Sequence, residues 1–188
     1  MDIRNVVSLS GGLLLLGAVG YFWGGFGKSP LSAESVAATG LPDYEVSGIR
    51  AIRTDARGQV SDTLSARSLR HFPDGDRGEI DAPVLQYFRD GSLRWQLTAD
   101  RALTYRENRE IRLAGNVLAE TLGAGLPIRL TTPSLTADRD NQTLSTTEPV
   151  MITNGHSSLR SLGLHVDIRQ GILELPAQVR GNYVYPSR

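Results

Sequence analysis

The sequence predicts an all-β domain preceded by one membrane-spanning helix. Two observations carry the β prediction: short apolar segments with alternating polar residues follow Tyr44, and clusters of turn-forming residues separate them. No stretch after residue 44 sustains a helical period. The third observation is an uncharged apolar run near the N-terminus, which indicates the helix.

The apolar run covers Val6 to Phe26, VVSLSGGLLLLGAVGYFWGGF. As a helix it would be about 31 Å long, which matches a bilayer core of about 30 Å. Tyr21 to Trp23 lie near its outer end, where aromatic rings favour the membrane interface. A cleaved signal peptide is the competing interpretation, with small-residue sites after Gly27 or Ala33. We expect an uncleaved anchor over residues 1–27.

Residues 28–43 are expected to form a linker, because they are rich in Ser, Ala, Gly and Pro and show no period. The β-domain is expected over residues 44–188. Arg4 and Lys28 give almost no charge bias across the run. A cytoplasmic N-terminus is therefore inferred from the large polar C-terminal part.

Strand alternation is clearest in three segments. Leu93, Trp95 and Leu97 alternate with polar residues, and so do the apolar residues of 126–130 and of 162–168. Turn formers lie between the segments, for example at 73–76, 90–91, 138–141 and 170–171.

An internal repeat accompanies the alternation. Leu64, Leu97 and Leu130 open similar segments 33 residues apart, and Val84, Val117 and Val150 close them at the same interval. A shorter fourth unit runs from Leu159 to Val179. Each unit is predicted to be a strand, a turn and a return strand. Because one hairpin cannot bury its own apolar face, the units must stack.

Composition excludes several classes of function. The chain has 20 basic and 20 acidic residues, so it lacks the basic excess of a nucleic-acid binder. Without cysteine it has no disulfide, thiolate metal site or cysteine nucleophile. The histidines at 71, 156 and 165 form no metal-binding motif, and no catalytic motif is present. We expect no enzyme activity, catalytic residue, metal or cofactor.

Several stretches resemble the LptC family of lipopolysaccharide export. They are APVL at 82–85, WQLTADR at 95–101, GNV at 115–117, TTPSLT at 131–136, EPV at 148–150 and the closing run from Leu175 to Tyr183. Their order and spacing carry the resemblance, which extends over essentially the whole chain.

The resemblance implies a periplasmic β-jellyroll of two antiparallel sheets, as in LptA-like (OstA) proteins, anchored in the inner membrane of a Gram-negative bacterium. Such a domain receives the acyl chains of lipopolysaccharide from an ABC transporter, LptB with LptF and LptG. It passes them to a soluble LptA-like protein. The transporter is expected at the strand near Tyr44 to Arg53 and through the helix, and the acceptor at the strand from Ile172 to Tyr185.

Alternation selects the residues expected to line the lipid groove. They are Ile80, Trp95, Leu97, Leu113, Ile128, Leu130, Ile152, Leu164, Val166, Leu173, Leu175 and Tyr183. An ordinary sandwich core would place many of the same residues inside. A membrane-tethered β-scaffold that links transporter subunits without binding lipid therefore stays open as an alternative.

Overall fold

The computed structural model describes residues 40–105, 109–123 and 126–184. The described residues form twelve antiparallel strands and no helix, which confirms the all-β prediction. The expected anchor and most of the linker lie outside the described residues. The strands are β1 (Tyr44–Thr54), β2 (Val60–Phe72), β3 (Arg77–Asp81), β4 (Val84–Arg89), β5 (Ser92–Thr98), β6 (Arg101–Tyr105), β7 (Glu110–Thr121), β8 (Ile128–Asp138), β9 (Thr143–Asn154), β10 (Ser157–Asp167), β11 (Ile172–Glu174) and β12 (Ala177–Asn182).

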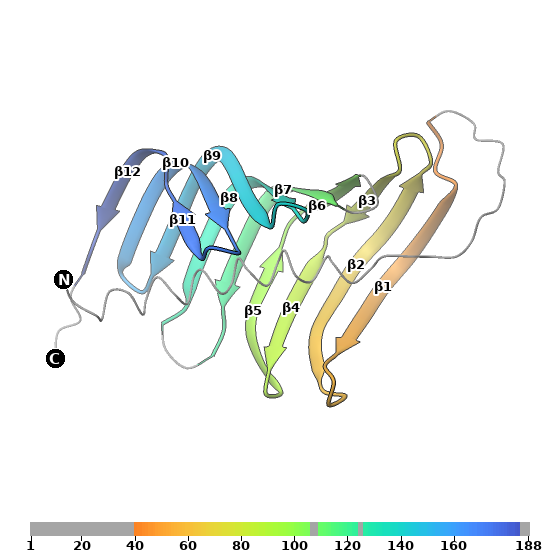
Figure 1. The fold of residues 1–188 in the computed structure, drawn as a ribbon, viewed down its shortest axis with the longest axis horizontal. Coiled ribbons are helices and arrows are strands. Elements are labelled where there is room, and N and C mark those ends of the chain that lie inside the picture. The colour runs from red at the N-terminus through yellow and green to blue at the C-terminus, as the bar shows by residue number, and fades with distance from the viewer. Residues whose placement is uncertain (1–39, 106–108, 124–125, 185–188) are drawn as a thin grey trace.

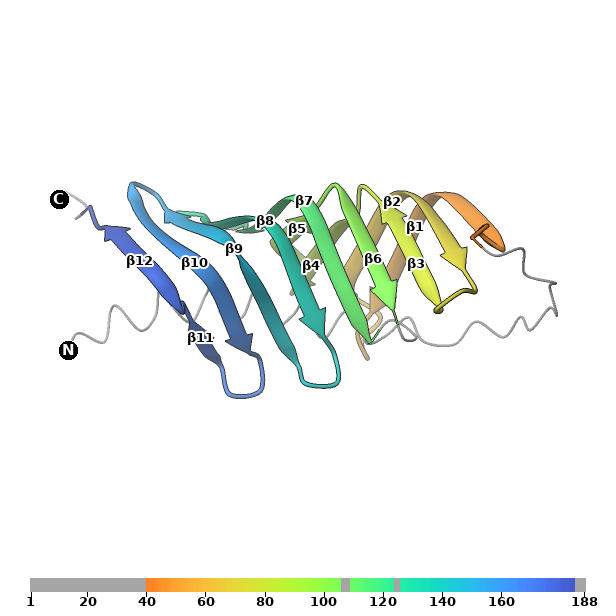
Figure 2. The same ribbon diagram turned by 90° about the horizontal axis from the view of Figure 1, so that it is seen from above.

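The strands form one continuous sheet folded into two facing layers (Figures 1 and 2). Long strands contribute one half to each layer. The end of β2 pairs with β3 and its beginning with β4. Likewise, the beginning of β7 pairs with β6 and its end with β5. We call the layer with β3, β6 and β11 the first layer, and the layer with β4, β5 and β12 the second.

Several long strands are irregular where they pass between the layers. The registers shift between Ala114 and Val117 in β7, between Thr131 and Thr136 in β8, and between Leu162 and Leu164 in β10. Such bulges bend a strand and raise its twist. We call the line of these bends the fold line.

Gly163 shows why the fold line depends on particular residues. Its φ is +87°, and a Cβ there would lie 2.9 Å from Pro176 Cγ and 3.3 Å from the Thr146 carbonyl oxygen. Only glycine adopts this backbone without strain and leaves room for that proline.

Two buried hydroxyls satisfy backbone carbonyls at the bends. Thr132 Oγ1 donates to the Ser134 carbonyl oxygen at 3.1 Å. Ser161 Oγ lies 3.0 Å from the carbonyl oxygens of both Gly163 and Ala177. A bulge removes ladder hydrogen bonds, so these contacts lower the cost of bending a buried strand.

The 33-residue repeat corresponds to one row of the second layer. Leu64 pairs with Leu85, Leu85 with Leu97, Leu97 with Ala119, Ala119 with Leu130, and Leu130 with Ile152. The repeated leucines therefore face the interior side by side, with one intervening strand between each two.

The predicted content of each repeat is wrong for three of the four units. Only β8 and β9 form a single strand and its return; the first unit contains β2 to β4, the second β5 to β7, and the fourth β10 to β12. One arm of each of these units is interrupted at the fold line. At the first break Ala82 has φ +49° and Pro83 has no backbone N–H to donate to a ladder.

The two ends of the folded sheet carry the edge strands. Within the described residues β1 pairs with β2 alone, whereas β11 and β12 both pair with β10. β1 and β12 lie at opposite ends of the molecule (Figure 1). The single strand expected over residues 172–185 is divided at Leu175 and Pro176 into β11 and β12.

Candidate lipid-binding interior

The interior is one apolar cluster to which both layers contribute. In the second layer it contains the row just described (Leu64, Leu85, Leu97, Ala119, Leu130 and Ile152), which we call the leucine row. In the first layer Ile80 pairs with Ala102, Ala102 with Leu113, and Leu113 with Leu135. Neighbouring strands thus present matching apolar side chains from β2 to β10.

A second inward row lies nearer the hairpins of the second layer. Its residues lie two positions from the leucine row along each strand. From β1 onward, Arg53 pairs with Asp62, Asp62 with Tyr87, Tyr87 with Trp95, and Trp95 with Thr121. Because side chains alternate along a strand, these residues share the inward face of the leucine row. We call Arg53, Asp62, Tyr87, Trp95 and Thr121 the rim row.

The structure places eleven of the twelve predicted groove residues in the strands or turn that bound the interior. Seven are buried (Ile80, Trp95, Leu97, Leu113, Leu130, Leu164 and Val166), and three are partly buried against them (Ile152, Leu173 and Leu175). Ile128 is half-buried at the start of β8. Tyr183 lies beyond the end of β12 with 62% of its surface exposed.

Sequence reasoning missed the charged pair of the rim row. The Asp62 side chain is 3% exposed, and its Oδ2 lies 2.9 Å from Arg53 Nε and 2.6 Å from Ser61 Oγ. Asp62 stands two residues before Leu64 in an alternating segment, and this inward parity is the signal that could have indicated its position. The partner that neutralises it lies across the β1–β2 hairpin.

The two aromatic residues of the rim row stack. The rings of Tyr87 and Trp95 have centroids 5.6 Å apart and planes inclined by 17°. Trp95 is 3% exposed, and its buried Nε1 has no hydrogen-bond partner among the described residues. A buried indole N–H normally finds an acceptor, so this donor is unusual.

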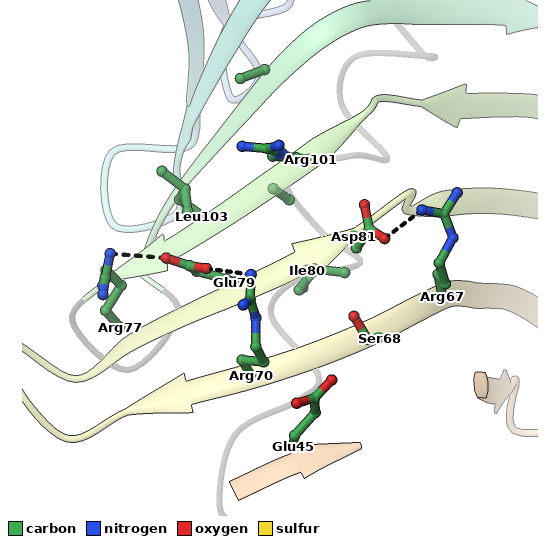
Figure 3. Close-up of a pocket in the computed structure, with 12 residues that line it drawn as sticks. Glu45, Arg67, Ser68, Arg70, Arg77, Glu79, Ile80, Asp81, Arg101 and Leu103 are labelled. Carbon is green, nitrogen blue, oxygen red and sulfur yellow. Dashed lines mark hydrogen bonds and ion pairs between the residues drawn. The ribbon is translucent and has the colours of Figure 1, made fainter. Parts of the chain in front are cut away.

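A charged groove of about 680 Å³ opens on β2, β3 and β6 (Figure 3). Its cations are mostly neutralised within the groove: Arg67 lies 2.8 Å from Asp81, and Arg70 and Arg77 each lie 2.9 Å from Glu79. Exposed ion pairs of this kind contribute about 0–1 kcal/mol each. The groove therefore has a polar character opposite to that of the interior.

His71 joins β2 to the start of β1. Its Nδ1 lies 2.7 Å from Asp43, its Nε2 lies 3.1 Å from Asp76, and its ring stacks on Tyr44 at 4.9 Å. Burial lowers the pKa of His71, but hydrogen bonds and charge attraction from the two aspartates outweigh it and raise the pKa overall. The cation form consequently stabilises this contact.

The described residues contain neither a group of three or more potential metal ligands among His, Asp and Glu nor a helix long and apolar enough to cross a membrane.

The folded antiparallel sheet with its apolar interior has the architecture of a β-jellyroll. Among solved structures, the fold of this chain is similar to that of LptH from Pseudomonas aeruginosa, described as the LptA-homologous periplasmic component of the conserved lipopolysaccharide transport device. The TM-score is 0.50 at 7% identity, with 66% of this chain and 95% of LptH covered. This likeness concerns the fold.

Residues 12–184 match the family model for lipopolysaccharide-assembly, LptC-related proteins, and the chain belongs to this family. The match confirms the resemblance found in the sequence. A comparison with curated proteins gave no match. Family membership assigns the chain a role in lipopolysaccharide transport and implies a periplasmic domain.

Proposed function

We propose that the chain binds the acyl chains of lipopolysaccharide between its two layers. It would take the lipid from an inner-membrane ABC transporter and pass it to a soluble LptA-like protein on the way to the outer membrane. The observation that carries this proposal is the apolar interior, which extends from β2 to β10 between two edge strands at opposite ends. No chemical step is required of the protein.

The energetics favour such a role. Each methylene removed from water contributes about 0.8 kcal/mol, so an acyl chain needs continuous apolar cover in the periplasm. Leu85, Leu97 and Leu130 of the leucine row lie on neighbouring or next-but-one strands and supply that cover along the sheet. The charged sugars of the lipid would stay in solvent, on the side of the interior where the hairpins of the second layer lie.

The edge strands supply surfaces for both partners. Val46 and Ile52 of β1 and Val179 of β12 are about half exposed. An exposed edge can pair with a strand of another chain. We propose that β1 joins the LptB, LptF and LptG transporter and that β12 joins the LptA-like acceptor.

The membrane attachment belongs to the same proposal. A helix over residues 6–26 would tether the β-domain to the inner membrane as a single-pass protein with a cytoplasmic N-terminus. The uncharged sequence of this stretch supports the helix.

The scaffold alternative draws on a specific observation as well. Seven of the predicted groove residues are buried by other side chains of the protein, as in an ordinary core. Lipid binding would then require the layers to part at the hairpin side, whereas a scaffold would never open.

Photo-crosslinking to lipopolysaccharide separates the two functions. A probe at Ile128 would lie half-buried next to Leu130, whereas a probe at Arg129 would face outward, where the arginine pairs with Glu120 at 3.0 Å. We expect a lipid adduct at 128 and none at 129, only while the assembled transporter hydrolyses ATP. Adducts at neither position in a folded, assembled complex would refute lipid carriage and favour the scaffold.

A further inference from the structure

The rim row combines an unused hydrogen-bond donor with an aromatic pair and a neutralised charge. We propose that it is a polar subsite for the neutral acceptor oxygens of an acylated ligand, the carbonyl and hydroxyl oxygens at which its chains are attached. This inference rests on the proposed function, because it states which part of the lipid lies in this row.

Trp95 provides the central donor. Its Nε1 is buried and has no acceptor among the described residues, while its ring stacks on Tyr87. A buried N–H without a partner lowers stability, and a ligand oxygen that accepts its hydrogen bond would remove that cost. The donor is thus better satisfied in the loaded protein than in the free one.

Thr121 extends the set of donors on the next strand. Its Oγ1 accepts a hydrogen bond from the Ile128 N–H at 2.8 Å, which leaves the hydroxyl proton to be donated. Trp95 pairs directly with Thr121 across β5 and β7. Adjacent strands lie about 4.8 Å apart, so two donors at this spacing can serve oxygens of one ligand.

The absence of a net charge in the rim row indicates that the ligand oxygens bound there are neutral. Asp62 Oδ2 lies 2.9 Å from Arg53 Nε, so the pair contributes no net charge. A phosphate site needs uncompensated cations, which this row lacks. Ester, amide and hydroxyl oxygens accept hydrogen bonds without bringing a charge into a buried site.

The position of the row relative to the leucine row fits such a ligand. Tyr87 follows Leu85 by two residues, and Trp95 precedes Leu97 by two. The two rows are therefore about 6–7 Å apart along each strand. A chain lying on Leu85 and Leu97 would bring its point of attachment to Tyr87 and Trp95.

The substitution Trp95→Phe tests the donor while keeping an aromatic ring. Fluorescent lipid A and a pyrene-labelled tetradecane, which has no oxygen, are titrated against the detergent-solubilised full chain. We expect Trp95→Phe to weaken lipid A binding about fivefold, as for one neutral hydrogen bond, and to change alkane binding less than twofold. Tyr105→Phe is the matched control, because Tyr105 lies on β6 in the first layer, outside the rim row, with its ring 5.2 Å from the Arg112 guanidinium. This variant should bind both probes as the unsubstituted chain does. The subsite is overturned if Trp95→Phe weakens the binding of both probes equally, or if it weakens the binding of neither.

The native indole gives a second measurement, should the variant fold poorly. In a Trp23→Phe background Trp95 supplies the one indole N–H resonance, because the chain has two tryptophans. We expect lipid A to shift this proton downfield and the alkane to leave it nearly unchanged. Bound lipid A without a downfield shift refutes the subsite alone, whereas no binding by the unsubstituted chain refutes the proposed function.

Discussion

The two ends of the interior are stabilised by different kinds of contact. Toward β1 the inward residues include an ion pair, Arg53 with Asp62, and a histidine between two aspartates, His71. Toward β10 the row of paired residues that begins at His71 ends in aliphatic side chains: Leu144 and Val166 pair directly and are 0% exposed. One folded sheet can therefore contain a polar end, suited to selective contacts, and an apolar end that depends on packing.

The largest expected effect tests the apolar end. Leu144→Ala removes a fully buried side chain and should lower the free energy of unfolding by about 3 kcal/mol, since the cavity cannot close completely. Urea denaturation followed by circular dichroism measures the change. Val179→Ala, at a half-exposed site on β12, is the control and should stay within about 0.5 kcal/mol. Equal losses would mean that packing is not concentrated between the layers.

An intermediate effect is expected at the polar end. Asp62→Ala leaves a partly buried guanidinium without its carboxylate and should cost about 2 kcal/mol, less than a fully buried pair because Arg53 keeps 26% of its side chain exposed. Asp81→Ala breaks the exposed pair with Arg67 and should cost below about 0.5 kcal/mol. Both values come from urea denaturation.

The double variant Arg53→Met with Asp62→Leu sharpens this prediction. An apolar pair of similar volume should regain most of the stability lost in Asp62→Ala, because neither charge remains to be desolvated. If the double variant is less stable than Asp62→Ala, the ion pair itself stabilises the polar end and the comparison of the two ends must be revised.

Alternation predicted much of the interior but little of its polar part. Leu97 and Leu130 lie in the cluster as their period-two pattern indicates. Asp62 has the same inward parity, but a carboxylate is normally placed in solvent, and only the tertiary pairing with Arg53 reverses that preference. The alternation also groups Tyr183 with the interior, whereas β12 ends at Asn182.

The division into two layers was not readable from single residues. It depends on bends at the fold line, where Ala82 and Asn116 adopt positive φ without being glycine. Local preference disfavours that backbone for alanine, so the surrounding pairing must impose it. The breaks that divide the repeat units therefore come from tertiary structure.

The smallest expected effect concerns His71 and pH. Its pKa is raised in the folded chain by Asp43 and Asp76 against the effect of burial, from an ordinary value of 6.5. The resulting stabilisation is full below pH 6.5 and decreases as the pH rises through the raised pKa, because the unfolded chain releases the proton first. The melting temperature of the unsubstituted chain should therefore fall between about pH 6 and pH 8 more than that of His71→Gln.

His156→Gln is the matched control, since His156 makes no ion pair among the described residues, and it should keep the pH dependence of the unsubstituted chain. Parallel melting curves for the unsubstituted chain and His71→Gln would show that the cation does not stabilise β1, leaving the Arg53–Asp62 pair as the main charge contact of the polar end.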